Sequence, residues 1–126
     1  EGNLIGLVCR KDIINFVRYP LATRNPTTKQ LLVGAAVSTH PQDRERIDKL
    51  VQAGVDVIVV DAAQGASMYQ LETIKYIKQK YPTGVDVIGG NVVTGAQVQH
   101  LIRAGVDGLR VGMGIGRLFV YRLLQN

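Results

Sequence analysis

Residues 53–61 read Ala-Gly-Val-Asp-Val-Ile-Val-Val-Asp, and residues 104–111 echo this stretch as Ala-Gly-Val-Asp-Gly-Leu-Arg-Val. In both stretches a glycine ends a helix-periodic segment, and a near-continuous apolar run follows. Such runs are typical of parallel strands that are buried on both faces of an α/β sheet. The echo therefore predicts consecutive units in which a helix leads into a parallel strand.

The same alternation of short β-branched runs and helical segments extends over the chain from Gln30 onward. The predicted strands are Leu31–Val37, Val55–Val60, Val85–Ile88 and Val106–Val111. The predicted helix signals are Pro41 at a first helical position, capping boxes at Ser67 to Gln70 and Thr94 to Gln97, and the terminal glycines Gly54 and Gly105. The predicted buried stripes are Ile47, Leu50 and Val51, then Leu71, Ile74 and Ile77, then Val98, Leu101 and Ile102.

The length of the chain limits the architecture. At 126 residues it is too short for a complete eight-stranded α/β barrel, which needs about 250 residues. The length of each strand–helix unit fits both a barrel and a doubly wound sheet, so it leaves these two architectures open. Before the first unit, Leu4–Cys9 is expected to form a short strand followed by a helical turn. Tyr19–Lys29 is expected to be a linker, with a module boundary near Pro20.

Composition excludes several classes of protein. The 15 Lys and Arg residues exceed the 10 Asp and Glu residues by a net charge of +5, but they are scattered, which makes nucleic-acid binding an unfavoured reading. The single cysteine, Cys9, excludes an intramolecular disulfide framework and a thiolate-rich metal site. The sequence shows no signal-peptide pattern and no apolar run of about 20 residues, so we expect a cytoplasmic chain without a membrane segment.

Ligands of parallel α/β sheets bind at the carboxyl ends of the strands. Asp61, at one of these ends, is either a turn residue or an acceptor for ribose hydroxyls. Nearby glycines allow close approach of the backbone to a ligand, although Gly112-x-Gly114-x-Gly116 lacks the third spacing of a dinucleotide fingerprint. The four segments expected at this edge are Ser38-Thr-His40, Asp61-Ala-Ala-Gln-Gly65, Gly89-Gly-Asn91 and Gly112-Met-Gly-Ile-Gly116.

Two longer motifs, Val87-Ile-Gly-Gly-Asn-Val-Val-Thr94 and Leu109-Arg-Val-Gly-Met-Gly114, narrow the choice of family. With Gly34-Ala-Ala36 and Ile74-Lys-Tyr-Ile77, they resemble in order and spacing the catalytic barrel of inosine-5′-monophosphate (IMP) dehydrogenases. The resemblance implies an α/β fold, a partial (β/α)8 TIM barrel covering about strands three to six, with strands one, two, seven and eight absent. It also implies four segments: residues 1–19 as the end of a CBS-like module, 20–30 as a linker, 31–114 as the partial barrel and 115–126 as a divergent tail.

The resemblance also implies a set of site residues and ligands. The family is an NAD-dependent oxidoreductase that converts IMP, NAD and water to XMP and NADH in guanine nucleotide synthesis, works as a homotetramer and uses a potassium ion. By this comparison Asn91 and Arg117 lie at the substrate, and Gly114 and Gly116 offer backbone carbonyls to potassium. The cofactor-binding positions are Asp61, Ala62, Ala63, Asn91, Arg110, Gly112, Met113 and Gly114.

Departures from the family pattern affect the chemistry that we expect. The family's nucleophilic Cys position holds Phe119, which cannot add to a purine, so no catalytic nucleophile is assigned. Ala62 and Ala63 replace two serines on the cofactor side, at about 1 kcal/mol per lost hydrogen bond. Arg117 replaces the serine that binds the substrate phosphate. The abrupt change after Gly114 is typical of a read-through, a frame change or an alternative exon.

These departures lead us to expect a fragment of an IMP dehydrogenase that is inactive by itself. The alternative is a non-catalytic interaction or regulatory module that associates with the full-length enzyme, and a weaker alternative is a fragment of a GMP reductase. In the tail, the apolar residues Leu118, Phe119, Val120, Leu123 and Leu124 predict either an amphipathic helix that docks a partner or a membrane, or a short helix or frayed tail over the core.

Overall fold

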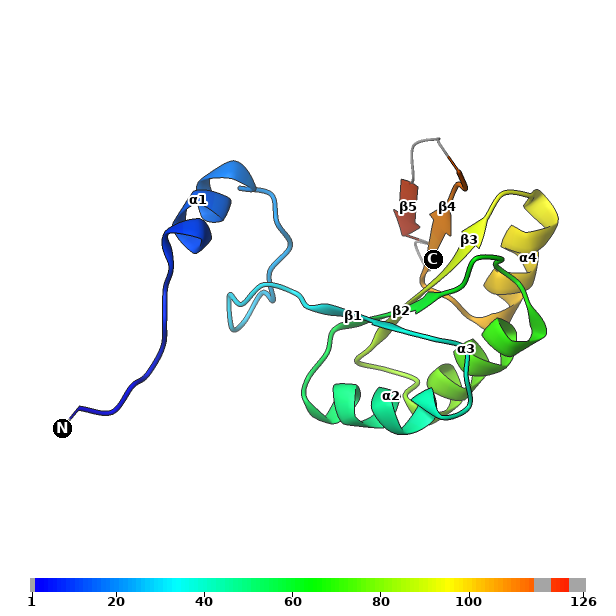
Figure 1. The fold of residues 1–126 in the computed structure, drawn as a ribbon, viewed down its shortest axis with the longest axis horizontal. Coiled ribbons are helices and arrows are strands. Elements are labelled where there is room, and N and C mark those ends of the chain that lie inside the picture. The colour runs from blue at the N-terminus through cyan, green and yellow to red at the C-terminus, as the bar shows by residue number, and fades with distance from the viewer. Residues whose placement is uncertain (1, 115–118, 123–126) are drawn as a thin grey trace. The chain divides into compact units, whose positions relative to one another are not determined.

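A computed structural model of the chain describes residues 2–114 and 119–122 (Figure 1). The chain divides into two units, Glu1–Leu32 and Val33–Asn126, which are described separately below.

The second unit is built on one five-stranded sheet. Its first four strands run parallel and lie side by side in chain order, and the fifth pairs antiparallel with the fourth. The strands are β1 (Gly34–Val37), β2 (Val57–Asp61), β3 (Asp86–Val92), β4 (Gly108–Val111) and β5 (Phe119–Arg122). The helices between the parallel strands are α2 (Asp43–Gln52), α3 (Met68–Lys80) and α4 (Gly95–Ala104).

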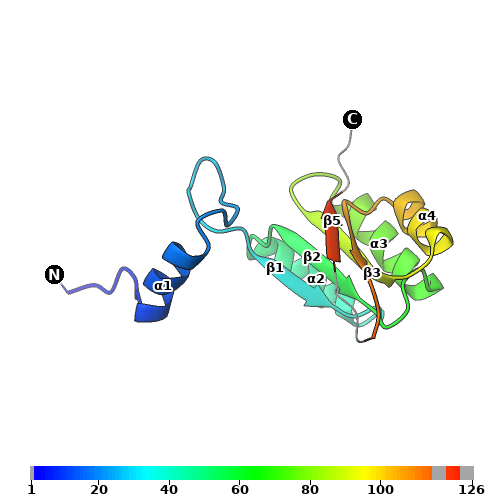
Figure 2. The same cartoon turned by 90° about the horizontal axis from the view of Figure 1, so that it is seen from above.

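The order of the strands distinguishes a barrel from a doubly wound sheet, the two architectures that fit the length of the strand–helix units. A doubly wound sheet reverses its strand order at a switch point and carries helices on both faces. Here the order β1-β2-β3-β4 has no reversal, and α2, α3 and α4 lie on the same side of the sheet (Figure 2). The unit is therefore an α/β fold whose parallel four-stranded part is consistent with part of a (β/α)8 barrel.

The core lies between the sheet and these helices. Ile58 and Val60 of β2 and Val87 of β3 are fully buried on the helix-facing side, against Ile74 and other apolar residues. Burial of each such side chain stabilises the fold by about 1.5–3 kcal/mol. The helix residues that complete the core are Ile47 of α2, Ile77 of α3 and Leu101 and Ala104 of α4.

Both Ala-Gly-Val-Asp motifs join a helix end to a strand in the same way. Gly54 and Gly105 have φ values of +86° and +96°, which favour glycine. The Asp56 carboxylate accepts the backbone N–H of Val33 at 2.8 Å, and the Asp107 carboxylate accepts that of Val87 at 2.6 Å. Each aspartate therefore ties the start of its own strand to the neighbouring strand, which explains why the motif recurs.

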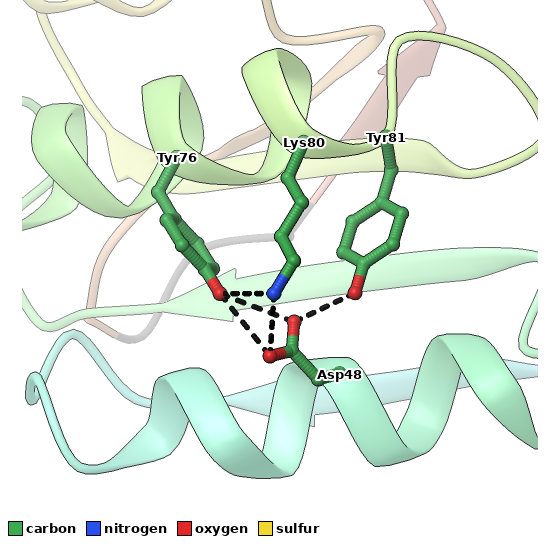
Figure 3. Close-up of polar contacts among 4 residues, drawn as sticks. All are labelled: Asp48, Tyr76, Lys80 and Tyr81. Carbon is green, nitrogen blue, oxygen red and sulfur yellow. Dashed lines mark hydrogen bonds and ion pairs between the residues drawn. The ribbon is translucent and has the colours of Figure 1, made fainter.

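A polar cluster on the helical layer joins α2 to the end of α3 (Figure 3). The Asp48 carboxylate accepts hydrogen bonds from Lys80 Nζ and from the Tyr81 hydroxyl, both at 2.7 Å, and from the Tyr76 hydroxyl at 3.1 Å. The hydrogen bonds from Lys80 and Tyr81 lower the pKa of the Asp48 carboxyl. The hydrogen bonds with Asp48 in turn raise the pKa of Lys80 and the pKa of Tyr81.

The four predicted parallel strands and three predicted helices are present, with some shifts. Thr94 and Gln97 form the predicted capping box of α4, whereas α2 begins at Asp43 and not at Pro41. The reason is a tight turn, in which Asp43 N–H donates to the His40 carbonyl and the Asp43 carboxylate accepts the Ser38 N–H at 2.7 Å. That hydrogen bond from Ser38 also lowers the pKa of Asp43.

Two predictions about apolar residues were wrong. Ile102 was expected inside, but it is 45% exposed, because consecutive helix residues point about 100° apart and Leu101 and Ala104 occupy the buried face of α4. The predicted tail helix is also wrong for residues 119–122, which form strand β5 beside β4, where ladder hydrogen bonds are available. Leu118, Leu123 and Leu124 lie outside the described residues.

The first unit contains the helix α1 (Arg10–Arg18) and a tight turn. The expected helical turn after Cys9 is confirmed and is longer than expected, with Asp12 accepting the Cys9 N–H at 2.8 Å. The expected strand over residues 4–9 was wrong. Ile5 is fully exposed, and no neighbouring strand among the described residues completes a ladder with this segment. In the part of the chain that the structure describes, no helix combines the length and apolar character needed to cross a bilayer.

Candidate functional site

The predicted ligand edge, meaning the end of the sheet at which the parallel strands β2, β3 and β4 finish, is present in the structure. Because β2, β3 and β4 run in the same direction, the register sets Asp61 beside Gly90 and Gly90 beside Arg110. Asp61 is the last residue of β2, and Gly90 and Arg110 lie within two residues of the carboxyl ends of β3 and β4. Two residues that sequence analysis placed beside the cofactor, Asp61 and Arg110, are thus brought together across a single glycine.

Asp61 and Arg110 form an ion pair over Gly90. Arg110 Nη1 lies 3.2 Å from Asp61 Oδ1, and the two side chains are 34% and 55% exposed, respectively. A Cβ atom on Gly90 would lie 2.6 Å from the Arg110 carbonyl oxygen and 2.8 Å from Arg110 Cβ, so only glycine fits between the two strands. Exposed ion pairs are worth about 0–1 kcal/mol, so a ligand with hydroxyl or amide groups can compete for either partner.

Asn91, the residue that follows Gly90, contributes a buried polar group. Its Oδ1 atom is shielded from solvent and accepts no hydrogen bond from the part of the chain that the structure describes. Its backbone is well held, because the N–H donates to the Ala62 carbonyl at 2.9 Å and the carbonyl accepts the Gly65 N–H at 2.6 Å. An unpaired buried acceptor costs about 1–3 kcal/mol, and a donor on a ligand would recover that cost.

The loop after β2 packs directly on the end of β3. A Cβ atom on Gly65 would lie 2.5 Å from the Asn91 carbonyl oxygen, so the loop requires glycine at this point. Ala62 donates its N–H to the Gly90 carbonyl at 3.2 Å, and Ala63 is exposed. The two alanines therefore offer backbone groups and methyl groups, but no hydroxyls, at the edge.

The segment after β4 completes the described part of the edge. Gly112 has a φ of +123° and donates its N–H to the Val92 carbonyl at 3.0 Å, while Met113 is 48% exposed. Gly114 has a φ of +79°. Gly116 and Arg117, which were expected at the potassium ion and the substrate phosphate, lie outside the described residues.

Phe119, which sequence analysis expected at the position of the family's nucleophile, lies in β5 and pairs with Val111 of β4. The described residues contain no group of three or more His, Cys, Asp or Glu side chains placed to hold a metal ion. Cys9 belongs to the first unit. The side chains of Asp61, Asn91 and Arg110 offer hydrogen bonds and charge at the described edge.

Sequence analysis missed one residue of this edge, Gln70. Ser67 caps α3 by accepting the Gln70 N–H at 3.2 Å, as predicted, but the Gln70 carboxamide does not fold back to complete the capping box at Ser67. Gln70 is fully buried and bonds instead to the ends of β2 and β3. The signal was present, because residues 70, 74 and 77 have the i, i+4, i+7 spacing of the buried stripe.

Comparison with known proteins places the chain in a family. Residues 9–125 match the model of the IMP dehydrogenase / GMP reductase domain. The inosine-5′-monophosphate dehydrogenase of Schizosaccharomyces pombe is 49% identical over 92% of this chain and 22% of its own length. The enzymes of the same name from Vigna unguiculata and Toxoplasma gondii are 49% and 51% identical, over 94% and 91% of this chain and 24% and 20% of their own lengths.

The chain thus spans about a fifth to a quarter of the length of these relatives. The matched region includes the four parallel strands and every described residue of the edge. At this level of identity and coverage, the chain belongs to the IMP dehydrogenase family.

Proposed function

We propose that the polar edge at the ends of β2, β3 and β4 binds the nicotinamide-ribose part of NAD, and that the chain is a non-catalytic part of an IMP dehydrogenase barrel. The observation that carries the proposal is the Asp61–Arg110 pair over Gly90, together with the buried Asn91 Oδ1, which accepts no hydrogen bond from the described residues. This arrangement combines an exposed carboxylate, a cation and a buried acceptor on a backbone that approaches a ligand closely.

Each of these groups has a place in cofactor binding. The Asp61 carboxylate accepts hydrogen bonds from vicinal ribose hydroxyls, which are good donors to a charged acceptor. Asn91 Oδ1 accepts an N–H from a carboxamide, and the Arg110 guanidinium donates to an oxygen of the same group. When bound, NAD supplies a hydride acceptor. The donors and acceptors present fit such a ligand, while Ala62 and Ala63 reduce the number of its contacts.

The substrate and the potassium ion belong to the same proposal. IMP is the substrate named by the relatives, and Arg117 would meet its phosphate by charge rather than through the hydrogen bond of a serine. Potassium would take the carbonyls of Gly114 and Gly116. Of these two glycines, Gly114 lies among the described residues.

The chain is proposed to bind without turning over. Covalent catalysis on a purine needs an activated nucleophile. Phe119, at the position where the family carries cysteine, has no nucleophilic side-chain atom. Asp61 and Arg110 can orient a ligand, but they cannot replace a thiolate that adds to carbon. The expected activity is therefore ligand binding with no formation of NADH.

The test is a fluorescence anisotropy titration of NADH with the full chain and two variants. Asp61→Asn removes the charge at the edge, and we expect it to weaken binding by about fivefold to tenfold. Asp56→Asn removes one carboxylate at the opposite end of the same strand and should leave binding unchanged. Equal affinity of all three proteins, or no binding by the unmodified chain, would overturn the proposed site. NADH formation from IMP and NAD with potassium would overturn the proposed lack of turnover.

A second function, association with full-length subunits, is favoured by the sheet face that carries no helices. On that face Val57, Val59 and Ile88 are only half-buried, and β1 forms an edge of the described sheet. Apolar faces and open edges of this kind favour pairing with another chain. Co-purification of the tagged chain with a full-length IMP dehydrogenase would support this function. A strictly monomeric chain that does not bind the enzyme would contradict it.

A further inference from the structure

The side chain of Gln70 connects three pieces of the candidate site from behind the sheet. Gln70 lies in the first turn of α3 and is fully buried. Its Nε2 donates to the Val60 carbonyl at 3.0 Å and to the Gly90 carbonyl at 2.6 Å. Its Oε1 accepts the Ala66 N–H at 2.9 Å. All the hydrogen bonds of this carboxamide thus go to backbone groups next to the ligand edge.

The two carbonyls that accept hydrogen bonds from Gln70 belong to the peptide groups that immediately precede Asp61 and Asn91. The Val60 carbonyl is part of the peptide that leads into Asp61, and the Gly90 carbonyl is part of the peptide that leads into Asn91. The orientation of each peptide sets the direction in which the next residue leaves its strand. Gln70 therefore acts on Asp61 and Asn91 without touching either side chain.

The third hydrogen bond fixes the loop between β2 and α3. Ala66 has a φ of +66°, an uncommon value for a residue with a Cβ atom. Its N–H is held by Gln70, and the adjacent Gly65 N–H is held by the Asn91 carbonyl at 2.6 Å. The loop that carries Ala62 and Ala63 is thus anchored at its far end by Gln70 and by the end of β3.

We propose that Gln70 is a positioning residue of the ligand-binding edge, whose buried carboxamide sets the separation and orientation of Asp61, Asn91 and the 62–66 loop. The inference rests on the proposed function, because it assigns Gln70 to the cofactor site of the preceding section. A buried glutamine needs hydrogen-bond partners, and the described partners of Gln70 are backbone groups that adjoin the ligand edge. Supporting groups of this kind decide whether ligand-binding groups are held in productive geometry.

The test compares Gln70→Met with Thr73→Val in the full chain. Methionine preserves the volume of the side chain and removes all three hydrogen bonds. Thr73 is also buried in α3, and its hydroxyl donates to the Tyr69 carbonyl of the same helix, so Thr73→Val controls for general destabilisation. The readouts are the affinity for NADH by anisotropy, and the unfolding midpoint, which establishes that both variants are folded at the temperature of the titration.

Gln70→Met is expected to weaken NADH binding by about tenfold, whereas Thr73→Val stays within about twofold of the unmodified chain. Binding by folded Gln70→Met within about twofold of the unmodified chain would overturn the proposal. If Gln70→Met does not fold, Gln70→Glu replaces it. A protonated Glu donates to one carbonyl and an ionised one repels both, so affinity should rise between pH 8 and pH 6 more than in the unmodified chain. An affinity that changes no more than that of the unmodified chain would overturn the proposal.

A separate readout distinguishes failure of this inference from failure of the proposed function. If the unmodified chain does not bind NADH, the proposed function fails, and the amide resonances of the variants then decide the role of Gln70. Gln70→Met should shift the amides of Asp61, Ala62 and Asn91 and leave that of Asp56, at the other end of β2, unchanged. Unchanged amides at Asp61 and Asn91 would overturn the positioning role whatever the ligand.

Discussion

The two Ala-Gly-Val-Asp motifs make the same hydrogen bonds at sites of different burial, so their aspartates should differ in stabilising effect. Asp107 accepts the N–H of Val87, which is fully buried, and its carboxylate also pairs with Lys78 at 2.5 Å. The Asp107 and Lys78 side chains are only 14% and 20% exposed. Asp56 accepts the N–H of Val33, which is 58% exposed.

The magnitude follows from what each substitution to alanine leaves behind. Asp107→Ala leaves a buried N–H without an acceptor and a half-buried ammonium without its partner, at a cost of about 2–3 kcal/mol. Asp56→Ala leaves an N–H that water can reach, at about 0.5–1 kcal/mol. Asp107→Asn keeps an acceptor for Val87 and removes only the ion pair, so its cost should fall between the other two.

The assay is urea unfolding of the three variants, followed by far-ultraviolet circular dichroism at constant pH and salt. The expected order of destabilisation is Asp107→Ala, then Asp107→Asn, then Asp56→Ala. Thermal unfolding should agree, with a shift in midpoint of about 4–8 °C per kcal/mol for a domain of this size. Equal destabilisation by Asp107→Ala and Asp56→Ala, within 0.5 kcal/mol, would refute the argument that burial of the paired N–H decides the cost.

The contact of Gly65 with Asn91 and the hydrogen bonds of Asp48 can be tested in the same way. Gly65→Ala should separate the loop from β3, because the new Cβ would lie 2.5 Å from the Asn91 carbonyl oxygen; NADH affinity should fall, and unchanged affinity would contradict the close approach. Asp48, whose pKa is lowered by hydrogen bonds from Lys80 and Tyr81, stabilises the fold above the unfolded-state pKa of about 4. That stability is lost as pH falls through the lower folded-state pKa, so Asp48→Asn should flatten the fall of the urea midpoint between pH 5 and pH 2.5. An equally steep fall in the variant would assign the acid sensitivity to other carboxyl groups.

Local patterns predicted the strand–helix units well because their signals are short-range. Gly54 and Gly105 end a helix through backbone conformation alone, and Thr94 with Gln97 caps one through side-chain contacts within a single turn. The position of Asp61 at the ligand edge followed from strand direction, which the apolar runs already indicated. These features depend on neighbours that are close in sequence.

The features that sequence analysis missed depend on contacts across the sheet. The ion pair between Asp61 and Arg110 requires the strand register that sets both residues beside Gly90. A sequence pattern does not specify which residues of neighbouring strands are paired. Gln70 fits a capping box by spacing, yet two carbonyls at the ends of β2 and β3 offer its buried carboxamide better partners. Strand β5 forms because β4 presents a free edge, which the amphipathic pattern of the tail did not indicate.

The most direct test of the central claim, that the polar edge of the β2–β4 sheet is a cofactor-binding site, is a titration of the isotope-labelled chain with NAD followed by amide resonances. We predict saturable shifts for Asp61, Ala62, Asn91 and Gly112, and none for Asp56 or Asp107 at the opposite ends of β2 and β4. Shifts confined to the opposite end of the sheet, or to α1 of the first unit, would contradict it. The absence of any saturable shift would contradict it equally.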